Sequence, residues 1–95
     1  MADYYHIYVS PKPGVTRAQV ENLLNSAIDW YRYDEKNWIL YTSSPARTWY
    51  SRLQPVIAPG GYVFICKLSL EDYFGFMPKG LWDWVQGPKG KDRGA

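Results

Sequence analysis

Rings and β-branched side chains alternate along residues 4–9, a pattern typical of a β-strand. The prolines at positions 11 and 13 lack N–H donors, so the predicted strand ends before them. Apolar residues then recur at helical spacing from Val20 to Ala27. Thr16 and Gln19 precede them as a capping box, in which each side chain can satisfy the backbone N–H of the other, and a first helix is predicted here.

Two further runs of rings and β-branched residues, 27–33 and 38–42, flank a polar break at 34–37, which predicts an antiparallel hairpin. Ser44 is the expected N-cap of a second helix, with Pro45 at its first position, where a missing N–H does no harm. Pro55 is expected to end this helix soon after Leu53. Its expected inner stripe consists of Ala46, Trp49, Tyr50 and Leu53.

After a turn at Pro59-Gly60-Gly61, residues 62–68 form a near-continuous apolar stretch, which predicts a central strand buried on both sides. Residues 69–72 suggest a one-turn helix, and residues 81–85 a short amphipathic piece that docks on the rest. Residues 87–95 have no apolar group to offset the entropy of ordering, so a disordered basic tail is predicted.

The predicted element order is strand, helix, strand, strand, helix, strand. Two right-handed crossovers joined by a hairpin give the α+β, ferredoxin-like βαββαβ fold. It has a four-stranded antiparallel sheet with both helices on one face, here followed by a short C-terminal segment. Ninety-five residues suit one domain, which we expect to span residues 1–86.

Strand alternation predicts which side chains share a face of the sheet. Tyr5, Ile7 and Val9 should lie under the helices, together with Val63 and Ile65 of the last strand. The opposite face should then be aromatic. Its expected members are Tyr4, His6, Tyr8, Tyr62 and Phe64, with Tyr31, Tyr33 and Tyr41 as neighbours.

Composition makes this second face the main candidate for function. Five tryptophans, nine tyrosines and three phenylalanines are more ring surface than so small an interior can enclose, and an open aromatic patch usually marks an interaction site. The face could pack on the C-terminal segment or on a second copy of the chain, or it could stack nucleic-acid bases as an RNA-recognition sheet does. The expected interface anchors are Tyr4, Tyr8, Phe64, Tyr73, Phe74 and Phe76.

Charge argues against the nucleic-acid reading. The net charge is +2, but residues 87–95 carry all of it, which leaves eight basic and eight acidic residues in the body. Nucleic-acid binders usually show a basic patch. In an RNA-recognition sheet, the glycine-aromatic motif lies on the third strand and follows a basic residue. Here it lies on the fourth predicted strand and follows Pro59 and Gly60. If nucleic acid is bound, the expected contacts are Arg32, Arg47, Arg52, Tyr62 and Phe64.

Few side chains are suited to catalysis or metal binding. His6 is the sole histidine and Cys66 the sole cysteine, which excludes a Cys/His zinc site and an intrachain disulfide. We expect Cys66 to be a small buried hydrophobe and the compartment to be the reducing cytoplasm. Neither a signal peptide nor a membrane span is indicated. No catalytic residue, metal site or cofactor is predicted.

Residues 27–85 resemble the short bacterial proteins described as SinR-like. The resemblance is carried by Trp38-Ile39 leading to Thr42-Ser43, a helix ending in Arg52-Leu53-Gln54-Pro55, a strand ending in Lys67-Leu68, and a late element with Trp82 and Trp84. Such proteins are similar in fold to the CRISPR adaptation subunit and the VapD toxins. The resemblance implies a homodimer, and for the adaptation subunit a metal-holding aspartate at the end of strand one.

That aspartate is absent here, because strand one ends Tyr8-Val9-Ser10 and no acidic residue occurs from Tyr4 to Val20. A phosphodiester mechanism needs carboxylate oxygens to hold its ion. The sequence therefore favours a non-enzymatic homodimeric interaction domain that uses the aromatic face and the C-terminal segment. The alternative is a nucleic-acid-binding protein or a degenerate nuclease. An enzyme acting on a small molecule in a ring-lined cleft is a third reading, without a named nucleophile or base.

Overall fold

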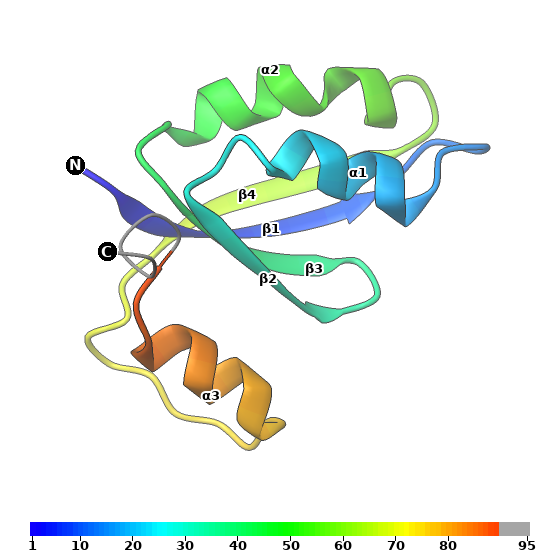
Figure 1. Ribbon diagram of the computed structural model, residues 1–95. Helices are drawn as coiled ribbons and strands as arrows, with labels where there is room; N and C mark the ends of the chain where they lie inside the picture. The colour runs from blue at the N-terminus through cyan, green and yellow to red at the C-terminus, as the bar shows by residue number, and fades with distance from the viewer. Residues whose placement is uncertain (90–95) are drawn as a thin grey trace.

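The computed structural model describes residues 1–89 as an α+β fold with a four-stranded antiparallel sheet and three helices (Figure 1). The α+β class and the antiparallel sheet are confirmed, whereas two helices were expected and a third is present. The elements are β1 (Asp3–Ser10), α1 (Arg17–Leu24), β2 (Asp29–Asp34), β3 (Asn37–Thr42), α2 (Ala46–Ile57), β4 (Tyr62–Leu68) and α3 (Lys79–Gln86). The strand order is β2-β3-β1-β4.

The main core lies between the sheet and the layer formed by α1 and α2 (Figure 1). Tyr5, Ile7 and Val9 are buried in it, as the alternation of β1 predicts. The two largest fully buried side chains are Trp38 of β3 and Trp49 of α2. This face of the sheet therefore accounts for only a small part of the chain's ring surface.

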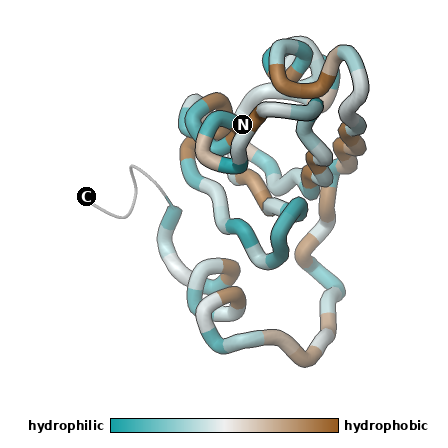
Figure 2. The backbone as a smooth tube through the Cα atoms, turned by 90° about the vertical axis from the view of Figure 1, so that its right-hand side faces the viewer, coloured by the Kyte–Doolittle hydropathy of each residue, from teal (hydrophilic) through white to brown (hydrophobic). Residues whose placement is uncertain are grey.

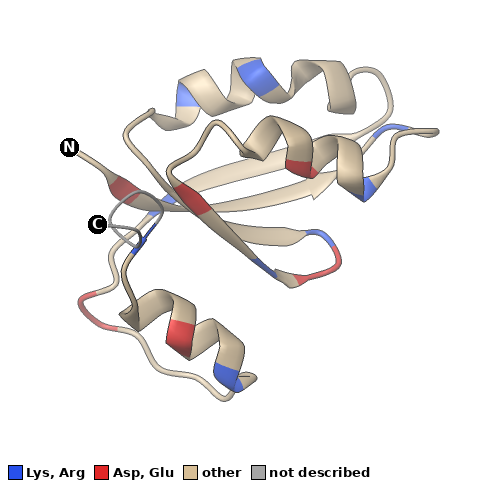
Figure 3. Ribbon diagram, in the orientation of Figure 1, with Lys and Arg blue, Asp and Glu red and all other residues tan. Residues whose placement is uncertain are grey.

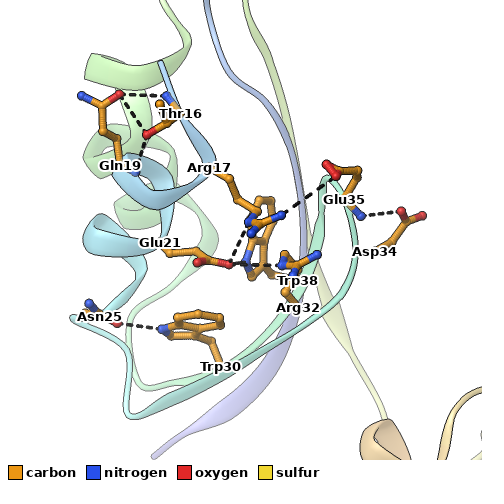
Figure 4. A network of polar contacts seen from close by, with 10 residues as sticks. All are labelled: Thr16, Arg17, Gln19, Glu21, Asn25, Trp30, Arg32, Asp34, Glu35 and Trp38. Carbon is orange, nitrogen blue, oxygen red and sulfur yellow. Dashed lines mark hydrogen bonds and ion pairs between the residues drawn. The ribbon is translucent and has the colours of Figure 1, made fainter. Parts of the chain in front are cut away.

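The capping box and the hairpin are both confirmed. Thr16 and Gln19 bond each other's backbone N–H at the start of α1 (Figure 4). Strands β2 and β3 pair antiparallel with Asp34 opposite Asn37, so the loop between them has two residues and is shorter than the expected polar break. A register shift between Arg32 and Asp34 marks a bulge in β2.

The expected ends of α2 are wrong. The N-cap is Pro45 and no side chain caps the helix. Pro55 lies inside α2, which continues to Ile57. Burial of Val56 and Ile57 in the core offsets the hydrogen bond lost at the proline. Tyr50, expected on the inner stripe, is exposed.

The prediction that residues 62–68 form a central strand is also wrong. Strand β4 pairs only with β1 and lies at the edge of the sheet. Val63 and Ile65 pack on the main core, but the opposite side of β4 is open. Cys66 is therefore exposed and is not the buried hydrophobe that was expected.

The chain after β4 crosses to the other side of the sheet and ends in α3 (Figure 1). Residues 69–72 form a turn and not the expected one-turn helix. Lys89, expected in a disordered tail, is buried, and its amino group lies 4.7 Å from the centroid of the Trp84 ring, so the tail prediction is wrong for this residue. Residues 90–95 of that tail lie outside the described part of the chain. Within residues 1–89, no helix is long and apolar enough to cross a membrane.

Candidate interaction surface

Helix α3 covers one end of the second face of the sheet. Ile39, Leu81 and Trp84 are buried between them, and Tyr4, Tyr31 and Tyr41 pack around this small cluster. The Trp84 ring stacks on Tyr31 at 5.9 Å between centroids and meets the edge of Tyr4 at 6.1 Å. Tyr4 was an expected interface anchor, but much of its ring is engaged within its own chain.

The other end of this face, along β4, has no such cover. Tyr62 and Phe64 project from β4 and are exposed, and Phe64 pairs in register with the half-buried Tyr8 of β1. Tyr8, a second expected anchor, therefore lies at the margin of the open area. The geometry of an edge strand explains this exposure, since no neighbouring strand lies beyond β4 to carry a helix across it.

The connection from β4 to α3 adds further exposed rings, and Figure 2 shows hydrophobic stretches along it. Tyr73 stacks on Trp82 with centroids 6.0 Å apart, whereas Phe74 and Phe76 are fully exposed. With Phe64 at 62% exposure, all three phenylalanines of the chain lie on the surface. We call the five exposed rings Tyr62, Phe64, Tyr73, Phe74 and Phe76 the aromatic surface.

An apolar cavity of about 260 Å³ adjoins the aromatic surface. It lies between the second face of the sheet, the 70–77 connection and α3. Its lining includes His6, Tyr33, Leu68, Phe74, Leu81 and Val85. His6 Nε2 and the Tyr33 hydroxyl are 2.8 Å apart and satisfy each other. Burial lowers the pKa of His6, and the effect of the Asn37 side chain opposes it without reversing it, so the imidazole is neutral near pH 7.

No pattern in the sequence indicates this cavity. Alternation places His6 on the second face, and amphipathicity predicts the short helix, but nothing in the local pattern shows that Leu68 and Val85 line the same cavity. Their placement there depends on the path of the connection between β4 and α3. That path has no regular structure and hence no periodic signal.

The two edges of the sheet differ in protection. Strand β2 has a bulge and three charged residues, features that oppose pairing with another chain. Strand β4 has an unbroken register from Tyr62 to Leu68 and one charge, Lys67, whose amino group lies 3.5 Å from a carboxylate oxygen of Asp3. The aromatic surface therefore borders the less protected edge.

The structure does not gather the candidate nucleic-acid contacts into one site. The Arg32 Nε lies 3.3 Å from the carboxylate of Glu21, which also accepts a bond from Trp38 Nε1 (Figure 4). Arg52 lies over the Trp49 ring at 4.7 Å and donates to Ser26. Arg47 does lie beside a candidate ring: it lines an open groove of about 570 Å³ between α2 and β4, together with Phe64.

Charges of both signs are interspersed over the described residues (Figure 3). Among residues 1–89, no group of three or more His, Cys, Asp or Glu side chains lies close enough together to hold a metal ion. Comparison with protein-family models gives no match, and neither curated proteins nor solved structures match the chain.

Proposed function

We propose that this protein is a non-enzymatic interaction domain that forms a homodimer through its aromatic surface. The observation that carries the proposal is the exposure of all three phenylalanines, on β4 and on the connection to α3. Burying one such ring contributes about 1.5–3 kcal/mol. A chain that leaves three of them in water gives up several kcal/mol unless a partner covers them.

The area also supports this proposal. The exposed fractions of the five rings add up to nearly four whole side chains. At about 150–250 Å² per ring this is about 570–950 Å² per chain. A standard-size interface buries about 800 Å² per partner. The aromatic surface alone is therefore large enough for a stable dimer.

The test compares the wild-type protein with the triple variant Phe64→Ser, Phe74→Ser, Phe76→Ser by light scattering after gel filtration. We expect a dimer for the wild type and a monomer for the variant. The thermal midpoint of the variant's monomer should change little, because the three side chains are absent from the main core. Tyr50→Ser, which removes an exposed ring from α2, is the matched control and should remain a dimer. A triple variant that dimerises like the wild type would contradict the proposal.

We also infer that β1 to β4 with α1 and α2 are arranged as in ferredoxin-like domains. The order βαββαβ supports this, as does a sheet whose central strands are β3 and β1. The same architecture is what the resemblance to the SinR-like proteins implies, and membership of that group is part of the proposal. The proposed compartment is the cytoplasm, since the exposed thiol of Cys66 stays reduced there.

Nucleic-acid binding is the second candidate, favoured by the groove that brings Arg47 beside Phe64. The cation and the ring would supply a phosphate contact and a base stack. A gel-shift experiment with RNA and DNA at low and moderate salt tests it. Retardation that Arg47→Ala weakens at both salt concentrations would support this function, and unretarded nucleic acid would exclude it. The degenerate-nuclease form of this candidate predicts binding without cleavage in the same experiment.

A further inference from the structure

We infer that the dimer is built by reciprocal insertion: the Phe76 ring of each copy enters the apolar cavity of the other. This inference rests on the proposed function and gives it a binding mode. The cavity is the one beneath the 70–77 connection, and its occupant is a side chain of a second copy of this chain.

The cavity and the ring match in size and polarity. An apolar protein cavity of about 150 Å³ is enough to bind benzene. This cavity is larger, about 260 Å³, and is lined mainly by apolar side chains. The polar groups on its wall, His6 Nε2 and the Tyr33 hydroxyl, already bond each other, so an entering ring leaves neither without a partner.

The occupant comes from another copy because of where Phe76 lies in the chain. Its neighbours Gly75 and Met77 both line the cavity, whereas Phe76 is fully exposed to solvent. Turning Phe76 into the cavity of its own chain would require those two residues to leave it. A second copy can supply the same ring without that rearrangement.

Two-fold symmetry allows both insertions in one dimer. In an isologous interface the same patch of both subunits meets itself, so a ring and a hole on one patch each find their complement. Phe76 and the cavity satisfy this condition, because the connection that carries the ring also forms part of the cavity wall. With both Phe76 rings inserted, the interface closes on two copies.

The test uses one variant without the ring and one without the hole. Phe76→Ala removes the ring, and Val85→Phe fills the cavity from its wall. Each variant alone should dimerise at least about 100-fold more weakly than the wild type, because two buried rings are lost per dimer. An equimolar mixture should form a heterodimer of intermediate affinity. The Val85→Phe chain keeps its Phe76 ring, and this ring can still enter the unfilled cavity of the Phe76→Ala chain.

Circular dichroism verifies that each variant is folded, and Leu70→Phe replaces Val85→Phe if that variant fails to fold. Tyr50→Ser is again the matched control. Wild-type affinity for Phe76→Ala, or a mixture that stays monomeric, would overturn the insertion while leaving the proposed dimer intact. A monomeric wild type would overturn the dimer itself. NMR of the monomeric state gives a further check. If Phe76→Ala shifts the signals of the rings that line the cavity in the monomer, Phe76 contacts the cavity of its own chain, which would also contradict the inference.

Discussion

At the scale of single residues, the two buried tryptophans of the main core are held by specific polar partners. The fully buried Trp49 donates from Nε1 to the Thr42 hydroxyl at 3.2 Å, and Trp38 donates to Glu21 at 3.1 Å. A buried indole N–H usually finds an acceptor, and these two do so within the main core. Neither partner is visible in the sequence, because Thr42 and Trp49 lie on different elements.

Replacing Thr42 by Val tests the first of these bonds. The variant keeps the side-chain shape but leaves the Trp49 N–H buried without an acceptor, so the free energy of unfolding should fall by about 1–3 kcal/mol. Thr42→Ser keeps the acceptor and is the control. Urea unfolding of the three proteins gives the comparison, and equal stability of Thr42→Val and the wild type would contradict the assignment.

His6 should make stability depend on pH. Its pKa in the folded protein is lowered mainly by burial, whereas the unfolded chain has the ordinary value of about 6.5. The unfolded state therefore takes up the proton first, so the contribution of His6 is fully present above about pH 6.5 and is lost as the pH falls below it.

His6→Gln removes that titration. The urea midpoint of the wild type should fall more steeply than that of the variant between about pH 7.5 and about pH 5.5. Comparing the two slopes cancels the loss of the hydrogen bond to Tyr33, which lowers stability at every pH. Parallel slopes would show that burial does not lower the pKa of this imidazole.

At the scale of elements, the sequence predicts best where side chains repeat with a clear period. The capping box of α1, the inward face of β1 and the β2–β3 hairpin all follow from local patterns. The position of β4 in the sheet could not be predicted in this way. Its apolar run is compatible with a central strand and also with an edge strand whose open side binds a partner. The ends of α2 depend on tertiary burial, which offsets the proline.

Helix α3 packs on the sheet through two buried side chains, Leu81 and Trp84, and its docking should depend most on the larger one, Trp84. Trp84→Ala should lower the free energy of unfolding by about 3–5 kcal/mol if the helix stays docked, and by less if it detaches. Hydrogen exchange distinguishes the two: α3 amides should exchange faster, while those of β1 keep their protection. In the described residues Trp84 Nε1 is buried without a hydrogen-bond partner, so Trp84→Phe should cost under about 1.5 kcal/mol. Unchanged α3 exchange in Trp84→Ala would contradict this dependence.

At the scale of the whole molecule, two layers of packing leave one region uncovered. Helices α1 and α2 cover the first face, and α3 covers one end of the second. The ring surplus in the composition correctly indicates that some aromatics reach the surface. Which ones do so was only partly predictable: Phe64, Phe74 and Phe76 are exposed, whereas Tyr4 is engaged by Trp84.

Sedimentation equilibrium of the wild-type protein across micromolar concentrations tests the central claim most directly. If the aromatic surface joins two copies, the molar mass should approach twice the chain mass of 11.1 kDa as concentration rises. The distribution should fit a monomer–dimer equilibrium. A mass that stays at 11.1 kDa throughout would mean that the three phenylalanines remain in water, and the proposed role would be wrong.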